Sequence, residues 1–461
     1  MKKVFAVLLT ALLLVSCSSE KQPLNFTENP LTDEVPTSPV IRADETLPLH
    51  ASSSAYYADG TIYFAEGGWL KYMPVETGEA RVFCFDPLCI HDELRLDSDC
   101  PAIVYDSSTR VIVENGVCYF IARHSVQTGA ASSEDTWQLR AIDIESSRLR
   151  VLYETDIQFF DFWLLGDTIF LTEPAVVELD EDGKMTYLSG KNIVRLEKNG
   201  KTTVMLEDAD ELYPELIGSD GGALYYTSKY TGGTVYRTDY GFERSETAAT
   251  VERGACSFEI HDGWIYYIRR TGEYFEESGE EIAGEFDEQL SVLSAPAERC
   301  ELVRQRLNGE GEIETVCASV PMPKLNAQLS NRLFCIDRER NWLYYVPLEL
   351  SYRGCVVWEI PPEEAAFYLR FGEMHDRPVL TKKFSLTGGR LVELDLDTMQ
   401  ARDVLTDCGA DIVDLYGVED GRVWAQFEPY DVEKIEDLRA AGVKSDTRLT
   451  YSMIGSEEIL P

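Results

Sequence analysis

A short phrase of two turn residues followed by an apolar, aromatic run recurs along the sequence and limits the folds it can adopt. Clear copies begin at Asp59-Gly60, Asn115-Gly116 and Asp262-Gly263. Asn-Gly and Asp-Gly pairs form tight turns, and the aromatic and β-branched residues after them are typical of buried strands. Variants of the phrase begin at Gly166, Gly221, Asn341 and Asp420. A period near ~50 residues indicates a propeller or a related repeat fold.

Each copy is followed by a second strand, turn and strand, as in residues 138–144 and 148–153 around Glu145-Ser146-Ser147. Each unit therefore holds four antiparallel strands, which is the make-up of a propeller blade. We predict an all-β β-propeller of seven or eight blades over residues 40–461. An eighth blade would lie within the long sixth unit. The predicted blades span 50–85, 103–154, 159–207, 213–250, 256–318, 332–406 and 411–456. Residues 448–454 and residues 39–49 are expected to supply strands that close the last blade.

Strand direction predicts how the two faces of the ring differ. If the strands of a blade are called a to d, the a–b and c–d turns lie on one face, here called the turn face. The b–c loops and the d-to-a connections lie on the other, here called the loop-rich face. Three long b–c insertions, at 174–191, 271–299 and 351–384, are expected there. Binding residues usually occupy loops on a rigid scaffold, so ligands are expected on this face.

The first residues read as a targeting segment. Lys2 and Lys3 precede an apolar run from Val4 to Val15, too short to cross a bilayer as a helix and typical of a signal peptide. The run ends Leu-Val-Ser-Cys17, which resembles the lipobox of bacterial lipoproteins. We therefore expect a signal peptide at 1–16, a lipidated Cys17 and a Pro-rich tether at 17–39. The alternative is an ordinary secretory signal.

Charge limits the partners. The formal net charge is −39, and removal of Lys2 and Lys3 with the signal makes it −39 − 2 = −41. Such a surface repels phosphate backbones and anionic lipid headgroups, so nucleic acid is not expected as a partner. Solubility explains this charge, with attraction to cations or basic partners as the alternative. We expect a protein attached to the cell membrane by its lipid, outside the cytoplasm.

The densest cluster of reactive side chains has the spacing C-x4-C-x-H-x8-C and comprises Cys84, Cys89, His91 and Cys100. Three thiols and one imidazole could hold zinc tetrahedrally. A Cys84–Cys100 or Cys89–Cys100 disulfide is the competing interpretation, because export favours oxidation, and unpaired thiols are the third. In each case the loop is expected to staple blade one to blade two.

This loop resembles one found in uncharacterised Firmicutes-type lipoprotein β-propellers with Tyr-rich repeats. The resemblance rests on Cys84, Cys89, His91 and Cys100, together with Asp86, Pro87 and Pro101. It covers the loop specifically and the repeats loosely. It implies the propeller fold and the lipid anchor, and it supplies no activity.

No other pattern singles out a catalytic group, and no H-E-x-x-H, G-x-S-x-G or P-loop sequence is present. His375, Asp376 and Arg377 in the largest insertion are the remaining loop-face candidates. Cys118 is expected in the core, and a bond between Cys300 and Cys317 across a hairpin is allowed. The first functional hypothesis is a non-enzymatic binding or scaffold module for a protein or glycan ligand. The second is a carbohydrate-active hydrolase or lyase with carboxylates at the central channel.

Overall fold

The computed structural model contains strands and no helices among the residues that it describes. Six four-stranded antiparallel blades form a β-propeller, and a further sheet of three antiparallel strands lies beside the first and sixth blades. The described residues are 49–84, 86, 88–91, 100–104, 109–127, 133–156, 159, 161–173, 177–179, 185–187, 192–196, 201–206, 214–228, 232–274, 291–293, 298–308, 312–321, 332–348, 352–358, 379–384, 390–406, 410–419, 421–429 and 450–455.

The blades follow one another along the chain, and each is built from inner to outer strand. Blades one and two are β2 (Ala55–Ala58), β3 (Thr61–Glu66), β4 (Trp69–Pro74) and β5 (Arg81–Val82), then β6 (Val111–Glu114), β7 (Val117–Gln127), β8 (Ser133–Asp143) and β9 (Leu149–Thr155). Blades three and four are β10 (Phe162–Leu165), β11 (Thr168–Thr172), β14 (Ile193–Leu196) and β15 (Thr202–Leu206), then β16 (Pro214–Asp220), β17 (Ala223–Ser228), β18 (Gly232–Asp239) and β19 (Ser245–Arg253).

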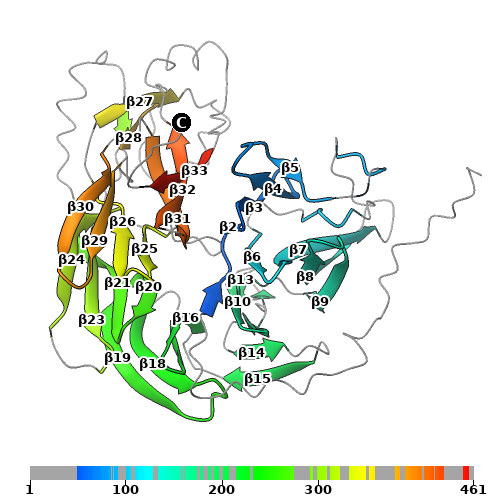
Figure 1. The fold of residues 1–461 in the computed structure, drawn as a ribbon, viewed down its shortest axis with the longest axis horizontal. Coiled ribbons are helices and arrows are strands. Elements are labelled where there is room, and N and C mark those ends of the chain that lie inside the picture. Colours follow the sequence, from blue (N-terminus) through cyan, green and yellow to red (C-terminus); the bar gives the residue numbers. More distant parts are fainter. Residues whose placement is uncertain are drawn as a thin grey trace, which may run out of the picture.

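The remaining sheets follow the same order. Blades five and six are β20 (Cys256–His261), β21 (Trp264–Tyr274), β23 (Glu298–Arg306) and β24 (Glu314–Val320), then β25 (Phe334–Asp337), β26 (Trp342–Tyr345), β29 (Leu391–Asp395) and β30 (Gln400–Leu405). The three-stranded sheet comprises β31 (Ala410–Glu419), β32 (Arg422–Pro429) and β33 (Thr450–Gly455). Figure 1 shows the first strand of every sheet gathered around the middle of the molecule.

The repeated turns have the predicted geometry. Asp59 and Gly60 adopt φ of 48° and 75°, and Asp262 and Gly263 adopt 47° and 72°. Two successive positive φ values define the tight hairpin turn whose twist matches antiparallel strands. The turn sequence therefore fixes the register of each inner hairpin, and the spans predicted for the blades agree with the observed strands to within a few residues.

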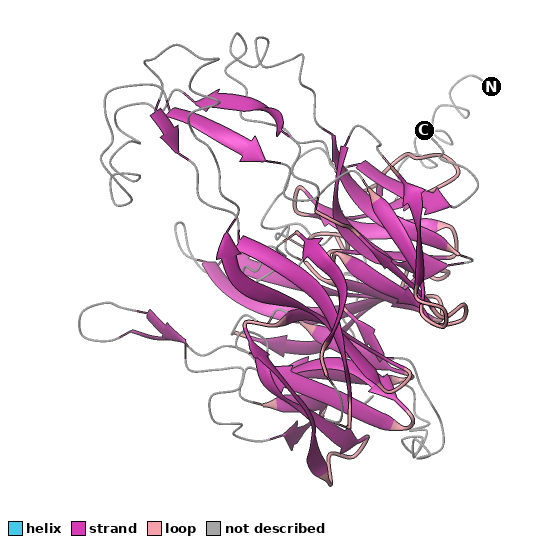
Figure 2. Ribbon diagram, turned by 90° about the vertical axis from the view of Figure 1, so that its left-hand side faces the viewer, coloured by secondary structure: helices cyan, strands magenta, loops and turns pink. Residues whose placement is uncertain are grey.

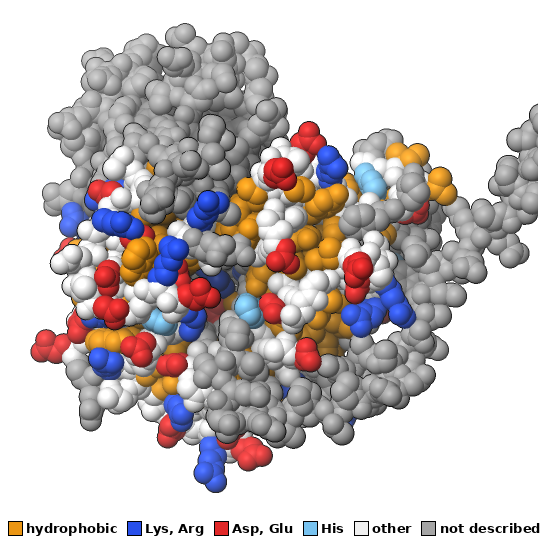
Figure 3. Space-filling model, in the orientation of Figure 1, with side chains coloured by type: hydrophobic (Ala, Val, Ile, Leu, Met, Phe, Trp, Pro, Cys, Tyr) orange, Lys and Arg blue, Asp and Glu red, His pale blue; other side chains and the backbone are white. Residues whose placement is uncertain are grey.

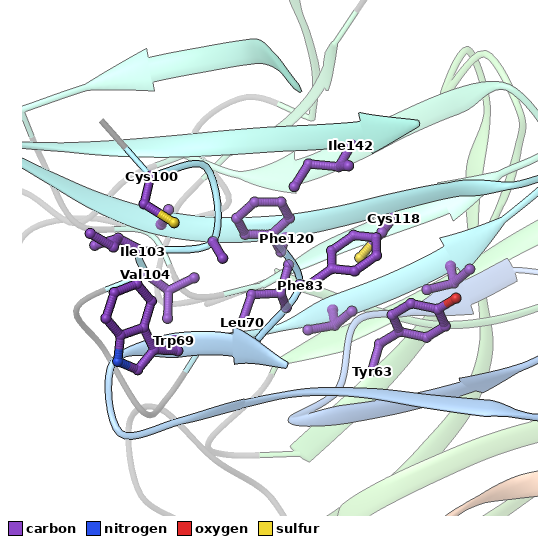
Figure 4. Packing of buried hydrophobic residues seen from close by; sticks show 14 residues of the cluster. Tyr63, Trp69, Leu70, Phe83, Cys100, Ile103, Val104, Cys118, Phe120 and Ile142 are labelled. Carbon is purple, nitrogen blue, oxygen red and sulfur yellow. The ribbon is translucent and has the colours of Figure 1, made fainter. Parts of the chain in front are cut away.

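Aromatic and aliphatic side chains from adjacent blades form the core. Between blades one and two, Leu70 and Phe83 pack with Phe120 and Cys118, and all four are buried (Figure 4). Cys118 is fully buried, which confirms its predicted core position. Each blade covers one face of the next, so the buried apolar residues form layers between neighbouring sheets.

The described insertions all interrupt the b–c connection of a blade, as predicted from strand direction. A hairpin of β12 (Val177–Leu179) and β13 (Met185–Tyr187) lies within blade three. In blades five and six, β22 (Ser291–Leu293), β27 (Tyr352–Trp358) and β28 (Val379–Phe384) join in one small sheet. Figure 2 shows the hairpin and this sheet standing off the blades on the left of the view. The described part of the long sixth unit thus forms a shared insertion sheet instead of a blade.

The strand β1 (Leu49–Ala51) differs from our expectation that residues 39–49 help to close the last blade. It pairs with β10, the inner strand of blade three, with Leu49 opposite Leu165 and Ala51 opposite Trp163. Leu49 and Ala51 pack against the buried cluster of blades three and four, which holds β1 inside the ring. The other expected closing strand, β33, does pair with β32.

Several predicted features lie outside the described residues. These are the signal peptide, Cys17, the tether, and the loop residues His375, Asp376 and Arg377. Within the described part of the chain, no helix is long and apolar enough to cross a membrane.

Candidate metal centre and central channel

The cysteine loop connects blade one to blade two, and both of its ends are fixed on β4. Cys84 directly follows Phe83, whose backbone N–H donates to the Leu70 carbonyl at 2.9 Å. At the other end, the Leu70 N–H donates to the Ala102 carbonyl at 2.7 Å, two residues after Cys100. Figure 4 shows Cys100 beside Ile103 and Val104, at the end of the packed cluster. The sheet itself therefore brings the two distant thiols to the same place.

The four predicted ligands converge. One donor atom each from Cys84, Cys89, His91 and Cys100 lies within 4.8 Å of the other three. Cys100 Sγ is 3.6 Å from His91 Nε2. With zinc–sulfur and zinc–nitrogen distances of about 2.3 and 2.0 Å, two ligands of a tetrahedral site are separated by about 3.6 Å. This S₃N set therefore has the composition and spacing of a structural zinc site.

Neighbouring groups position the middle of the loop. Asp86 accepts hydrogen bonds from the backbone N–H groups of Leu88 at 2.9 Å, through Oδ1, and of Cys89 at 3.1 Å, through its carbonyl. The His91 ring meets Trp69 edge-on, with centroids 5.2 Å apart. A turn at Asp86 and an aromatic wall thus aim Cys89 and His91 at the other two ligands.

Burial disfavours the thiolate form of two of the thiols, those of Cys89 and Cys100. Burial raises the pKa of Cys89, and burial raises the pKa of Cys100 further. A bound cation reverses this preference, because metal binding takes the deprotonated ligand and releases the proton. No disulfide joins any cysteines in the described part of the chain. The four donor atoms are therefore placed so that they could hold one metal ion.

The other predicted cysteine pair is not aligned for a bond. Cys300 lies opposite Val320, and Cys317 lies opposite Leu302, so a register shift separates the two thiols. The cross-strand bond that the sequence allows is therefore not formed in this hairpin. Cys300 is instead a buried core residue packed with Tyr266 and Leu302.

A cavity of about 120 Å³ lies at the centre of the ring. Its lining comes from β1 and from the first strands of blades three to six, together with Arg110 before β6 and Asp414 in β31. Several of these residues, such as Asp161 and Arg332, stand just before the beginning of an inner strand, which is the end nearest the loop-rich face. Others, such as Leu49 and Arg338, lie near the turn face. The chamber thus extends along the channel from the side where ligands were predicted.

Charged side chains of both signs line this chamber. Three are arginines and four are acids: Arg110, Arg332, Arg338, Asp161, Glu215, Glu259 and Asp414. Arg110 is buried, and its Nε lies 3.4 Å from Asp161 Oδ1. Apolar walls of Trp163, Phe258 and Phe334 separate the charges. Figure 3 shows acidic and basic side chains interspersed over the ring face as well, without one patch of a single sign.

Asp414 is the most perturbed acid of the chamber. It is 8% exposed, and burial raises its pKa to about 7, while the Arg332 N–H and the charges of Arg332 and Arg110 oppose that shift. A carboxyl group inside a cavity with a pKa near neutral pH is common at functional sites. Ion-pair networks in structural positions also shift pKa values in this way.

The side chain of His50 extends from β1 across the channel. His50 Nδ1 lies 3.1 Å from the Tyr56 hydroxyl on β2, and Nε2 lies 3.7 Å from a Glu114 carboxylate oxygen on β6. Burial lowers the pKa of His50, with the Glu114 charge opposing. The strand β1 is therefore tied to three blades at once, counting its ladder with β10.

Sequence reasoning found the cluster of Cys84, Cys89, His91 and Cys100 and missed the channel residues. Arg110, Asp161, Arg332 and Asp414 are spread over 300 positions, and only closure of the ring brings them together. One signal was available: Arg110, Asp161 and Arg332 each stand within two residues of the apolar run of an inner strand. A charged residue at that position in successive repeats points into the channel.

Comparisons with known proteins give fold likeness alone. No protein-family model and no curated protein matches the sequence. Among solved structures, an oligogalacturonate lyase in complex with manganese aligns at TM-score 0.39 and 8% identity, covering 82% of this chain and 87% of the lyase. A Mycobacterium tuberculosis puromycin-hydrolyzing peptidase aligns at TM-score 0.44 and 12% identity, covering 85% of this chain and 50% of the peptidase. Likenesses this distant carry no argument about activity.

Proposed function

We propose that this protein is a lipid-anchored, extracytoplasmic binding module whose ligand contacts the loop-rich face. The observation that carries the proposal is that the described b–c insertions, the cysteine loop and the mixed-charge chamber all belong to that side of the ring. Loops held by a rigid scaffold are the usual place for recognition. The turn face, by contrast, consists of short turns between neighbouring strands of one blade, which serve the fold.

The direction of β1 supports an orientation for the anchored protein. Leu49 lies opposite Leu165, next to the Gly166 turn, and its N–H donates to Ser219 Oγ at 3.1 Å. The strand β1 therefore begins at the end of the channel nearest the turn face. With lipid on Cys17, that face would be turned toward the membrane and the loop-rich face away from it.

We further propose that β31–β33 is a seventh blade. Its inner strand lies next to β25 of blade six and next to β2 of blade one, as a seventh blade requires. The outermost strand would come from residues outside the described part of the chain.

Zinc is the proposed metal of the Cys84, Cys89, His91 and Cys100 cluster. Four protein ligands would complete a tetrahedral shell, which leaves no position for a substrate and gives a structural role. The ion would stabilise the connection between blades one and two. The backbone of Trp69 and Leu70 already pairs with residues at the ends of this loop.

The binding role is tested by capture with the purified mature chain on glycan arrays and from extracellular or envelope fractions. The result expected is a saturable protein or glycan ligand whose binding is lost when loop-rich-face residues are changed. A matched control is Asp59→Asn, because an Asn-Gly pair keeps the turn geometry on the opposite face. A ligand that is insensitive to the loop-rich face would overturn the proposal.

The alternative function is a carbohydrate-active hydrolase or lyase, and one observation favours it. Carboxyl groups of Asp161, Glu215, Glu259 and Asp414 converge on one cavity, and one of them has a pKa near 7. Turnover of oligosaccharides that Glu259→Gln or Asp414→Asn abolishes, with the fold retained, would establish this function in place of the first.

A further inference from the structure

The central chamber has features of a built site and not of a gap between blades. It holds about 120 Å³, and a cavity of roughly 150 Å³ in another protein accommodates benzene. Its volume therefore suits a molecule of about six heavy atoms, or the end of a larger one. Asp414 is more than nine-tenths buried and contributes to the lining.

Two charged side chains of the chamber remain available to a ligand. Arg332 donates its backbone N–H to Asp414, yet its guanidinium forms no ion pair or hydrogen bond with the described residues. The Glu259 carboxylate likewise forms none within that part of the chain. Glu259 lies on β20 and Arg332 lies just before β25, and these two strands pack against each other. The two side chains form no ion pair with each other. One positive and one negative group thus face the same small volume.

The acids of the chamber do not form a cation site. Among the described residues, the one group whose donor atoms are close enough to share a metal ion is the cysteine cluster. No three carboxylates of the chamber are therefore close enough to share one ion. A simple anion is equally unsuited, because it would leave the acids desolvated without a partner.

We propose that the chamber binds a small zwitterion, a free α-amino acid with a short apolar side chain. Its carboxylate pairs with the Arg332 guanidinium, its ammonium group pairs with Glu259, and its side chain lies against Phe258 and Phe334. A ligand with both charges satisfies both groups, which neither a single ion nor an uncharged polyol does. This inference rests on the proposed binding role and names the ligand class of the channel.

Calorimetric titration of the full mature chain with alanine and leucine tests the proposal. N-acetylalanine lacks the positive charge, alanine methyl ester lacks the negative charge, and glucose is an uncharged polyol. We expect saturable binding of the free amino acids and at least about tenfold weaker binding of the other three, since a charged hydrogen bond contributes about that factor.

Two variants assign the contacts. Arg332→Gln is expected to weaken alanine binding about tenfold and to leave the methyl ester unchanged, because the ester no longer uses that contact. Glu259→Gln is expected to weaken alanine binding similarly and to leave N-acetylalanine unchanged. Glu246→Gln, on the exposed outer strand of blade four, is the control that leaves every probe unaffected.

Several results would overturn the inference. One is that neither amino acid binds saturably. Another is that N-acetylalanine and alanine methyl ester bind as tightly as alanine. A third is that glucose binds more tightly than alanine. Capture of a protein or glycan by a chain that binds neither amino acid would keep the proposed binding role and remove only the amino-acid site.

Discussion

The backbone N–H of Arg332 donates a hydrogen bond to Oδ1 of Asp414 at 2.8 Å, although the two residues are 82 positions apart. The Leu415 N–H returns a bond to the Arg332 carbonyl at 2.8 Å. These two bonds join the beginning of β25 to β31 and place a buried carboxyl on the ring axis. The hydrogen bonds stabilise the ionised carboxylate less than burial destabilises it, so the pKa of Asp414 is raised.

Asp414 should make stability depend on pH. Its folded pKa of about 7 lies above the value near 3.9 of an unfolded aspartate, so its stabilising contribution is complete below pH 4 and is lost as pH rises to 7. In Asp414→Asn the side chain no longer titrates. The unfolding free energy of the variant minus that of the wild type should therefore be about 2–3 kcal/mol larger at pH 8 than at pH 5. An equal difference at both pH values would show that Asp414 ionises normally.

Gly218 is required by close packing between blades four and five. A Cβ at this position would lie 2.7 Å from Ile260 Cβ, on the inner strand of the next blade. Gly218→Ala should cost about 1–3 kcal/mol in denaturant unfolding, because the two strands must separate. Gly241→Ala is the matched control, since its Cβ would meet ordinary contacts at 3.4 Å or more. Equal effects of the two substitutions would contradict this account of the interface.

Cys17 carries the proposed membrane attachment. Cys17→Ser removes the only thiol that could receive lipid at the end of the apolar run, so the protein should move from the membrane fraction to the soluble fraction. Labelling with a fatty-acid analogue should be lost at the same time. Ser19→Ala, two residues along, should change neither result. Continued membrane association of the unlabelled Ser variant would instead support an uncleaved signal segment.

Much of the fold could be predicted from the sequence because its turns have few alternatives. Asp59-Gly60 and Asp262-Gly263 permit one kind of hairpin, and that hairpin fixes which connections share a face. The same logic placed the insertions correctly. The position of β1 could not be predicted, since three residues such as Leu49 to Ala51 pair with any exposed inner edge that offers an apolar wall.

The candidate sites divide in the same way. Cys84, Cys89, His91 and Cys100 lie within 17 positions, so local spacing alone suggested a common ligand. Arg332 and Glu259 come together only through packing of two blades, and the position of Arg332 beside an inner strand does not tell which charges it will meet. Long-range convergence leaves no local pattern, which is why the chamber required the structure.

The metal centre is the claim on which the arrangement of the loop-rich face most depends. Cys118 provides a matched control, because it is buried in the same cluster as Cys100 but stands outside the ligand set. Cys118→Ala should cost about 1 kcal/mol and retain the metal. Cys100→Ala should release it, because it removes one of four ligands.

Metal analysis of the purified chain, combined with mass mapping of its cysteine peptides, is the most direct measurement. The account predicts one zinc per chain, bound by the wild type and by Cys118→Ala and absent from Cys100→Ala. It also predicts that Cys84, Cys89 and Cys100 all react with a thiol reagent after chelation and unfolding. A metal-free protein with a Cys84–Cys100 or Cys89–Cys100 disulfide would contradict it.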